Sequence, residues 1–370
     1  MPTLVKKNSS QSVKKIRQEK DRETLQLSVL EEKAKDVIHV GVIGCGYWGP
    51  NLIRNLHELA QVKIEMICDR QQDRLLPFAK KIPGVKLTTQ DQDIFKNPDI
   101  DAVVIATPIT THYPLVSQAL KSKKHVLVEK PLTATAQEGK KLIEQARRAN
   151  RILMVGHTFE YNPAVRKVSE LLKAGEIGQL YYIDSVRVNL GRHQTDGMNV
   201  VWDLAPHDIS IILKWVGKMP LSVSAHGQSY VQSGIEDVAF IRLEFEGGIV
   251  AHIHVSWLAP AKIRRMTLVG NKKMVIYDDL ENVEKIKIAD QAAHLNLDSR
   301  KNRIAYRMGD IVSPRLDVDE PLSRECAHFV DCIINQRRPE SDDVKGLQVV
   351  QVLEAASRSI KKGGAKVSIK

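Results

Sequence analysis

The chain has 370 residues, of which 43% are hydrophobic and 27% are charged. This length suggests about two domains, and the composition excludes bulk disorder because it supports a sizeable core. No apolar run reaches the roughly 18 residues of a transmembrane helix, and the N-terminal residues lack the apolar segment of a secretory signal. The four cysteines form neither a disulfide framework nor a zinc-binding CxxC pattern. We therefore expect a reduced, cytoplasmic protein without a metal.

Basic residues outnumber acidic residues by 55 to 44, so the net charge is +11. Such an excess can attract nucleic acid, an anionic membrane surface or an acidic small molecule. Residues 1–36 hold nine basic and six acidic residues, which supply +3, and the remaining charge is dispersed. Basic runs interleaved with aromatic residues are absent from the sequence, and aromatic residues make up only 5%. We therefore expect no nucleic acid and no membrane as partner, and the charge favours anionic small molecules.

Residues 1–36 are polar and free of aromatic side chains, which predicts a flexible N-terminal arm or an arm that packs on a neighbouring subunit. From residue 37 to residue 156, short β-branched runs alternate with helical stretches. The runs are apolar on both faces, which is typical of a buried parallel sheet. Helices are predicted at 51–59, 73–81, 112–120 and 136–149, the last with a capping box formed by Thr135 and Glu138. This alternation predicts an α/β fold, a doubly wound Rossmann domain.

Residues 157–370 show a different pattern, with one helix at 164–174 followed by longer runs of alternating residues. These runs predict an antiparallel sheet with one half-exposed face, and the EFEGGIV segment predicts a hairpin. Two helices at 322–335 and 344–361 end the chain. We therefore expect an open antiparallel α+β domain that binds substrate and mediates oligomerisation. Alternate residues of its strands appear apolar on both faces, which predicts a homodimer or homotetramer through the exposed face.

A GxGxxG motif follows the first predicted strand and precedes the first helix. The first glycine, Gly44, permits the tight turn, Gly46 lets a pyrophosphate approach the backbone, and Gly49 lets helix and strand pack closely. Free N–H groups at the helix start would bind the diphosphate. Tyr47 and Trp48 complete this loop and are predicted to contact the cofactor. The alternative, a glycine turn with a packing role alone, is less favoured because of the acidic residue that follows.

Asp69 lies 20 residues beyond Gly49, at the end of the second predicted strand. A carboxylate at this point accepts hydrogen bonds from the adenosine ribose. It would also repel a 2′-phosphate, so NAD is favoured over NADP, although Arg70 follows directly and could pair with that phosphate. Cys45 and Cys68 are interpreted as small buried residues and not as redox centres.

Two later strand ends carry polar residues, and strand ends are where ligands bind in such sheets. Thr107 and Pro108 follow the fourth strand and are predicted to line the cofactor. His112, just beyond, is either a further cofactor contact or simply a histidine at a helix start. The fifth strand ends in Glu129 and Lys130, and we expect burial and positive neighbours to lower the pKa of the lysine.

Asp203 and His207 stand four residues apart in a predicted helix, so they share a face. A carboxylate beside an imidazole orients the ring and raises its basicity, which makes His207 a candidate general base near neutral pH. The alternative is a structural Asp–His pair.

The GCGYWG turn, ATPxxxH, the VEKP strand end and the D-x-x-x-H helix occur here in one order and spacing. Together they resemble the glucose–fructose oxidoreductase, inositol dehydrogenase and rhizopine-catabolism (Gfo/Idh/MocA) family of NAD(P)-dependent dehydrogenases, over about residues 38–365. The resemblance implies a Rossmann domain and an antiparallel domain with the active site between them. It implies that Lys130, Asp203 and His207 are the catalytic residues. The implied cofactor contacts are Gly44, Gly46, Gly49, Asp69, Thr107, Pro108 and Glu129.

The segment GHTFEYNP resembles a family segment that often has arginine where this chain has Glu160, so a contact from Glu160 is in doubt. Tyr161 and Asn162 still match and are candidate substrate contacts. Further segments resemble a branch of 3-dehydrogenases acting on UDP-N-acetylglucosamine and its uronic acid. A sugar diphosphate would need cations, and the candidates are Arg187, Arg192, Lys262, Arg264 and Arg265. For any one of these cations, an ordinary solvated charge is the favoured alternative.

The sequence thus predicts an NAD-dependent dehydrogenase of a sugar-ring hydroxyl, with C3 of a UDP-N-acetylhexosamine or its uronic acid as the expected position. One alternative is a dehydrogenase of a free polyol or sugar such as inositol. The other is a non-catalytic NAD-binding regulator on the same fold.

Overall fold

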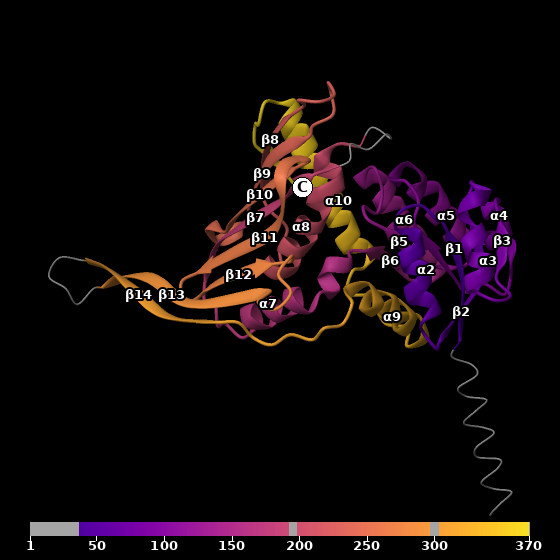
Figure 1. Ribbon diagram of the computed structural model, residues 1–370. Helices are drawn as coiled ribbons and strands as arrows, with labels where there is room; N and C mark the ends of the chain where they lie inside the picture. The colour runs from indigo at the N-terminus through magenta and orange to yellow at the C-terminus, as the bar shows by residue number, and fades with distance from the viewer. Residues whose placement is uncertain (1–36, 192–197, 297–302, 370) are drawn as a thin grey trace, which may run out of the picture.

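The computed structural model describes residues 37–191, 198–296 and 303–369. The predicted N-terminal arm and Arg192 lie outside these residues. Two sheets side by side organise the described chain, one in each half of the molecule (Figure 1). Within the described ranges, no helix combines the length and the apolar character that crossing a membrane requires.

The first sheet is parallel throughout and has the strand order β3-β2-β1-β4-β5-β6. Its strands are β1 (Ile38–Ile43), β2 (Val62–Cys68), β3 (Lys86–Thr88), β4 (Ala102–Ile105), β5 (His125–Glu129) and β6 (Leu153–Gly156). Strand β1 has β2 on one side and β4 on the other, so the strand order reverses there. Ligands bind at the carboxyl ends of the strands at such a reversal. The predicted doubly wound fold is confirmed.

Five α-helices connect these strands. They are α2 (Gly49–His57), α3 (Leu76–Lys81), α4 (Asp91–Lys96), α5 (His112–Lys121) and α6 (Ala136–Ala149). Helix α6 has the predicted bounds, and the capping box between Thr135 and Glu138 is present. A later helix, α9 (Pro321–Ile334), also packs in the core of this half, where Phe329 is fully buried with residues of β1 and α2. The division of the chain at residues 156 and 157 therefore stays a prediction.

The second sheet has nine strands in the order β14-β13-β12-β11-β7-β10-β9-β8-β15. Their bounds are β7 (Leu180–Leu190), β8 (Ser222–Gln228), β9 (Val238–Glu244), β10 (Val250–Ser256), β11 (Leu258–Gly270), β12 (Met274–Asp278), β13 (Ile286–Asn296), β14 (Arg303–Val312) and β15 (Val367–Ser368). Most neighbours are antiparallel, but β10 pairs with β7 in parallel, so the sheet is mixed. The predicted antiparallel sheet domain is confirmed, and the pairing of β10 with β7 is a feature that residue alternation does not reveal, because alternation reports burial and not strand direction.

Three helices cover one face of the second sheet and form its core: α7 (Pro163–Lys173), α8 (Val200–Val216) and α10 (Asp343–Lys361). The opposite face carries Phe240, Arg242 and His252, which are exposed, and His254, whose ring stacks on Phe240 with centroids 4.4 Å apart. The prediction that this outer face is largely apolar is therefore wrong. Its side chains are a mixture of polar, aromatic and aliphatic types, and Ile276 is an exposed aliphatic one.

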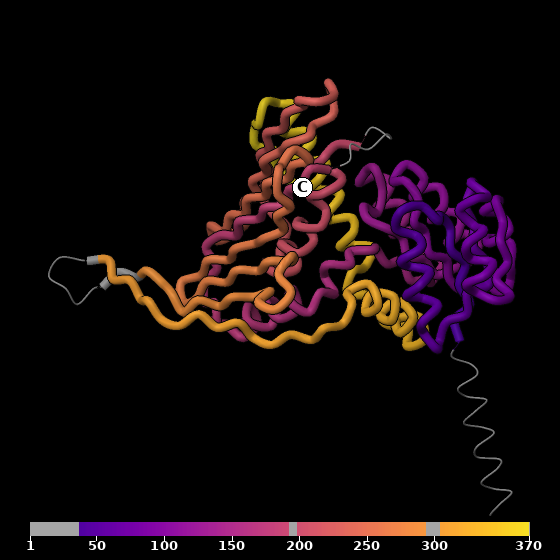
Figure 2. The backbone as a smooth tube through the Cα atoms, viewed as in Figure 1, coloured from indigo at the N-terminus to yellow at the C-terminus, as the bar shows by residue number. Residues whose placement is uncertain are grey.

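Strands β13 and β14 extend as a hairpin away from the rest of the molecule, and the chain then runs back along the second half to α9 (Figure 2). Alternate residues of β14 are exposed and apolar, namely Ile304, Tyr306 and Met308. This hairpin was not predicted from the sequence.

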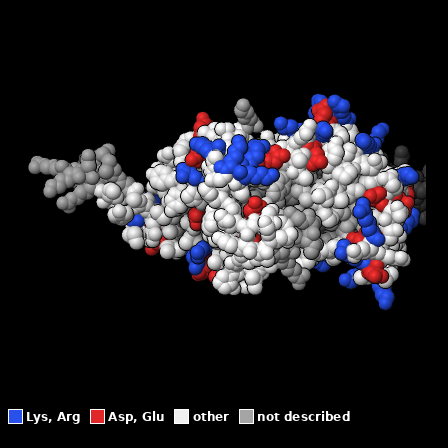
Figure 3. Space-filling view, turned by 90° about the horizontal axis from the view of Figure 1, so that it is seen from above, with Lys and Arg blue, Asp and Glu red and all other residues white. Residues whose placement is uncertain are grey.

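The face in Figure 3 shows how the charge is distributed on one side of the molecule. Lysine and arginine side chains form one dense group there. Elsewhere on this face they are mixed with aspartate and glutamate, and wide areas carry no charged side chain. On this face the charge does not form a continuous basic stripe.

Candidate active site

The glycine-rich loop between β1 and α2 forms a tight cradle. Gly44 has φ +101°, and a Cβ on it would lie 2.4 Å from the Ala106 carbonyl oxygen. A Cβ on Gly49 would lie 2.0 Å from the Gly44 oxygen, so both positions require glycine. Gly46 differs, because the nearest atom to a Cβ there is Arg74 Nη1, at 3.7 Å. The open space at Gly46 and the bare backbone around it fit a dinucleotide diphosphate at the start of α2.

Asp69 lies at the end of β2 with its carboxylate against this loop. One oxygen accepts the Cys45 N–H at 2.7 Å, and the other accepts the Gln71 N–H at 2.8 Å. These bonds fix the carboxylate beside the glycine-rich loop, where ribose hydroxyls can use its remaining lone pairs. Burial is the main cause that raises the pKa of both Cys45 and Cys68 to about 12, so these thiols are unreactive near neutral pH.

The cation nearest to Asp69 is Arg74, which the sequence analysis missed. Its Nη1 lies 3.8 Å from the Asp69 carboxylate and faces Gly46. Arg70, the predicted partner of a 2′-phosphate, is exposed. The sequence placed Arg70 next to Asp69, but the short 3-10 helix at Gln72–Arg74 turns the chain back toward the loop.

Replacing Arg74 with methionine should weaken NADP binding about tenfold and change NAD binding much less. The reason is that a guanidinium beside Asp69 offsets the repulsion between that carboxylate and a 2′-phosphate. Dissociation constants from fluorescence titration would measure both effects. Arg70→Met is the matched control, and a larger loss of NADP binding in that variant would contradict the assignment.

The side chain of His112 lies between the loops that follow strands β4 and β5. Its Nδ1 lies 2.8 Å from the Pro131 oxygen and its Nε2 lies 2.8 Å from the Thr107 oxygen. The ring is only 1% exposed and burial lowers its pKa, so the neutral ring donates its single N–H to one of these two oxygens. His112 therefore positions these two loops, which corrects the predicted cofactor contact. Thr107 and Pro108 lie at the end of β4, next to the glycine-rich loop.

Lys130 follows β5 and reaches helix α8 of the second half. Its Nζ donates to the backbone oxygen of Asp203 at 2.9 Å and lies 3.9 Å from the Asp203 carboxylate. Burial lowers the pKa of Lys130, while Asp203 and Glu129 partly oppose that shift. The predicted low pKa is confirmed in direction, and burial, as predicted, is its main cause. Positive neighbours contribute less.

Glu129 and Trp48 connect the glycine-rich loop to the end of β5. Burial raises the pKa of Glu129 to about 7, while Lys130 and a hydrogen bond from the Trp48 side chain lower it. A Cβ on Gly156 would lie 3.1 Å from the Glu129 carboxylate, so the chain leaves little space there. Tyr47 is 91% exposed and open to a ligand.

His207 lies on α8, which Asn199 caps through the Trp202 N–H. The helix is as predicted, but the predicted Asp203–His207 pair is not formed. The Asp203 carboxylate accepts the Trp257 Nε1–H at 3.0 Å, and His207 Nδ1 is buried without a hydrogen-bond partner among the described residues. The four-residue spacing fixes only the backbone positions of the two residues. The Asp203 carboxylate is hydrogen-bonded to Trp257 and not to His207.

The surroundings of His207 are aromatic and cationic. Phe159 packs edge-on against its ring with centroids 4.9 Å apart. Burial lowers the pKa of His207 well below its ordinary value, and Lys130, Arg187 and Arg264 lower it further. The predicted rise in basicity is therefore wrong. The ring is neutral near neutral pH and can accept a proton.

Arg187 is buried and forms an ion pair with Asp208. Its Nε lies 3.0 Å from both carboxylate oxygens and its Nη2 lies 2.9 Å from one, so the cation is not free as predicted. The guanidinium also lies over the Phe159 ring, 4.6 Å from its centroid. Its Nη1 has no hydrogen-bond partner within the described ranges. That nitrogen remains available to a polar ligand group.

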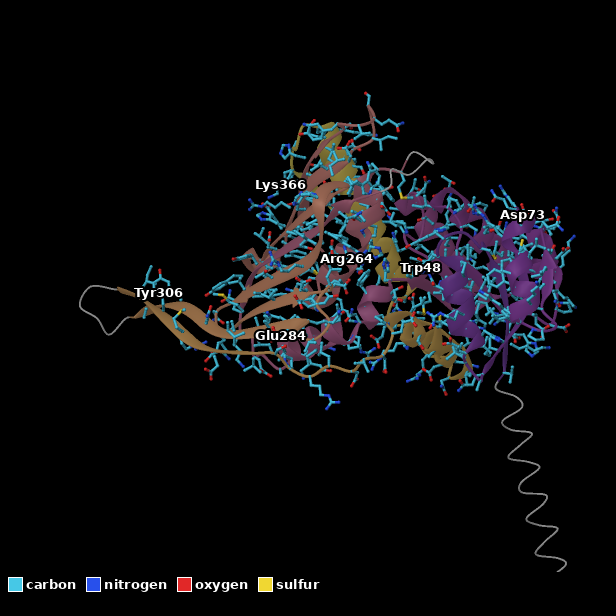
Figure 4. The ribbon with its side chains drawn as sticks, viewed as in Figure 1. Trp48, Asp73, Arg264, Glu284, Tyr306 and Lys366 are labelled. Carbon is cyan, nitrogen blue, oxygen red and sulfur yellow. The ribbon has the colours of Figure 1, made fainter. Side chains whose placement is uncertain are left out.

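Arg264, on β11, lies 3.4 Å from Asp279 and 5.9 Å from the Phe159 ring centroid. Figure 4 shows Arg264 and Trp48 near the boundary between the two halves, on opposite sides of it. Asn162 donates to the same Asp279 at 3.3 Å, so two predicted substrate residues meet at one carboxylate.

The other predicted substrate residues lie elsewhere. The buried Tyr161 hydroxyl lies 3.0 Å from the Ser341 hydroxyl, which corrects its predicted substrate contact. Lys262 and Arg265 are exposed on β11, and Arg265 points to the opposite face from Arg264 because side chains alternate along a strand. Sequence reasoning missed the roles of Phe159, Trp257, Asp208 and Asp279. Each contacts a predicted site residue only through the fold.

Comparison with known proteins identifies both halves. Residues 38–157 match the family model described as "Oxidoreductase family, NAD-binding Rossmann fold", and residues 165–276 match the "GFO/IDH/MocA C-terminal domain". A scyllo-inositol 2-dehydrogenase (NAD(+)) of Bacillus subtilis is 25% identical, over 88% of this chain and 95% of its own. A UDP-N-acetylglucosamine 3-dehydrogenase of Acidithiobacillus ferrooxidans is 26% identical, over 66% of this chain and 76% of its own.

Solved structures share the fold. The crystal structure of GenD2 from gentamicin A biosynthesis, in complex with NAD, superposes with a TM-score of 0.77 at 22% identity and covers 90% of this chain and 97% of its own. The glycine cradle, the carboxylate after β2 and the two matching family models agree with one another. The chain belongs to the Gfo/Idh/MocA family of NAD-binding oxidoreductases.

Proposed function

We propose that this oxidoreductase oxidises a ring hydroxyl of a sugar to a ketone, at C3 of a UDP-N-acetylhexosamine or its uronic acid. The observation that carries the proposal is the meeting of Lys130, at the end of β5, with helix α8, which bears His207. A lysine with a lowered pKa and a neutral imidazole together supply acid–base help at one place.

Each residue then has a role that its contacts support. The glycine-rich loop and Asp69 would hold NAD, which would supply the hydride acceptor for the carbon that carries the hydroxyl. His207 removes the hydroxyl proton, since its ring is neutral. Lys130 donates a hydrogen bond to the developing alkoxide. Asp203 holds Lys130 through its backbone oxygen, at 2.9 Å, which replaces its predicted role of orienting His207.

The cations near His207 favour an anionic substrate. Lys130, Arg187 and Arg264 all lower the pKa of His207. Each of them also lies beside a carboxylate, namely Asp203, Asp208 and Asp279. Arg187 Nη1, buried and unpartnered among the described residues, and Arg264 could bind a carboxylate or phosphate oxygen. A uronic acid would place such a group on the sugar ring itself.

A panel of substrates with NAD tests the proposal by the appearance of NADH absorbance. UDP-N-acetylglucosaminuronic acid should give the highest kcat/KM, followed by UDP-N-acetylglucosamine. The B. subtilis relative makes scyllo-inositol the second candidate substrate. If its kcat/KM is higher than that of the nucleotide sugars, the proposed substrate is wrong. Absence of NADH with every member of the panel would revive a non-catalytic regulator.

We also infer that the protein forms a homodimer or homotetramer in the cytoplasm. The exposed Tyr182 and Phe240 on the outer sheet face, and the exposed apolar residues of the β14 hairpin, support contact with a second copy. The four cysteines are free and buried, which suits a reducing compartment. Light scattering at micromolar concentration should give at least twice the monomer mass, and a monomer would contradict this inference.

A further inference from the structure

The Asp203 carboxylate, in the first turn of α8, has three candidate partners. One of its oxygens accepts the Trp257 indole N–H at 3.0 Å, and the other lies 3.9 Å from Lys130 Nζ. His207 is the third candidate, because residues four apart on a helix are neighbours on its surface. Its Nδ1 has no hydrogen-bond partner within the described residues. The carboxylate is therefore shared between Trp257 and Lys130, although an unpartnered imidazole nitrogen belongs to the same face of α8.

Trp257 is the fixed member of this group. It lies between β10 and β11 and is 1% exposed. Its backbone N–H donates to the Asp237 oxygen and its backbone oxygen accepts the Gly191 N–H, both at 2.9 Å. A Cβ on Gly191 would lie 2.6 Å from Trp257 Cδ1, so the glycine leaves room for the ring. The Asp203 side chain is 22% exposed and less confined, so the indole sets the orientation of the carboxylate.

An indole N–H differs from the other two candidates because it donates a hydrogen bond without taking part in proton exchange. It therefore holds Asp203 and leaves the negative charge of the carboxylate unpaired by a second cation. That charge stays beside Lys130, whose Nζ also donates to the Asp203 backbone oxygen at 2.9 Å. A bond between Asp203 and His207 would instead favour the imidazolium form of the ring, which cannot accept a proton.

We propose that Trp257 is a positioning residue, whose indole N–H keeps the Asp203 carboxylate beside Lys130 and away from His207. The inference rests on the proposed function, in which neutral His207 removes the hydroxyl proton and Lys130 donates a hydrogen bond to the developing alkoxide. Trp257 acts on both groups through Asp203. Without the indole N–H, the carboxylate turns toward the Nδ1 of His207.

The charges around the two acid–base groups show why the position of one carboxylate matters. Burial lowers the pKa of His207, and the basic groups that lower it further are Lys130, Arg187, Arg264 and His157. For Lys130, burial lowers the pKa, Asp203 and Glu129 raise it, and Arg187 lowers it. Moving the Asp203 carboxylate from Lys130 to His207 would therefore lower the pKa of the lysine and raise that of the histidine.

Trp257→Phe tests the proposal without any substrate, because it removes the N–H and keeps an aromatic ring. Nuclear magnetic resonance of ¹³C-labelled histidine rings would follow His207, whose signal is identified by its loss in His207→Gln. The wild-type ring should show no midpoint above about pH 5, and Trp257→Phe should bring a midpoint into the range of about pH 5–8. An unchanged His207 titration in Trp257→Phe would overturn the proposal.

Trp215→Phe is the matched control on the same helix. It removes the buried indole N–H that donates to the Val165 backbone oxygen at 3.0 Å, so it carries a similar loss of one hydrogen bond. The His207 signal should titrate in this variant as in wild type. If Trp257→Phe does not fold, 3-benzothienylalanine at position 257 replaces the N–H with sulfur in a ring of nearly the same size. A wild-type His207 titration with that residue would overturn the proposal.

Turnover of the preferred sugar of the panel gives a second arm. Trp257→Phe should lower kcat by a factor of about 10–100 and change KM less than about threefold. The pH profile of kcat should narrow from both sides, because the acid limb follows His207 and the alkaline limb follows Lys130. A lower kcat with both limbs unmoved would indicate a structural role for Trp257 and overturn the proposal.

A double-variant cycle shows whether Trp257 acts through Asp203. In the background of Asp203→Asn, the change Trp257→Phe should lower kcat no further, and additive losses would contradict the proposal. If no sugar is oxidised by the wild type, the proposed function fails, while the His207 titration still decides whether Trp257 controls the Asp203 carboxylate.

Discussion

Replacing Lys130 with methionine should lower kcat about 10²- to 10⁴-fold and leave NAD affinity nearly unchanged. Methionine keeps most of the side-chain length and removes the ammonium that reaches Asp203 at 2.9 Å. The developing alkoxide then loses its hydrogen-bond donor, while the glycine-rich loop and Asp69 are untouched. Initial rates of NADH formation at saturating substrate would measure kcat, and fluorescence titration would measure NAD binding.

Lys121→Met is the control, because Lys121 is exposed at the end of α5. A rate for Lys130→Met within a few fold of wild type would rule out the assigned role. The pH profile gives a further check. Burial lowers the pKa of His207, so its neutral form persists into acid. We therefore expect that protonation of His207 does not lower the wild-type oxidation rate near pH 6.5, where an ordinary histidine would titrate.

The first half of the fold was predictable because its local signals agree with its burial. Helix α6 has a capping box and an apolar stripe, and its bounds were predicted correctly. The predicted helix at 73–81 is instead a short 3-10 turn and α3, while β3 and α4 were missed. Strand β3 has three residues, none of them fully buried, so it leaves almost no pattern in the sequence.

The second half was less predictable because strand pairing there depends on distant partners. The hairpin of β13 and β14 leaves the core, so the residues of β14 are largely exposed and show no alternation of burial. The parallel pairing of β10 with β7 joins segments about 70 residues apart, and the pattern of either strand alone is the same for both directions.

The site shows the same limit at the level of side chains. The positions of Lys130 and His207 follow from a strand end and a helix, which the sequence indicates. The partner of Asp203 does not, because Trp257 lies between β10 and β11, 54 residues later in the chain. Arg187 was predicted as a free cation since nothing in the sequence pairs it with Asp208. Yet Asp208 directly follows His207, so the ion pair is built into the catalytic helix.

Asp208→Ala should therefore lower the free energy of unfolding by about 3–5 kcal/mol, the usual cost of leaving a buried charge without its partner. Arg187 is 2% exposed and Asp208 is 1% exposed, so water cannot replace the lost carboxylate. Urea denaturation would measure the change. Glu246→Ala, which breaks an exposed pair with Lys218, should leave the midpoint unchanged.

The double variant Arg187→Met, Asp208→Leu separates the charge from the packing. It should recover most of the lost stability, because no unpaired charge stays buried. It should not recover activity, since Arg187 lies over Phe159 beside His207 and lowers the pKa of that histidine. A double variant as unstable as Asp208→Ala would show that packing around α8, and not the buried charge, sets the cost. A double variant with full kcat/KM would contradict the proposal that Arg187 binds the substrate.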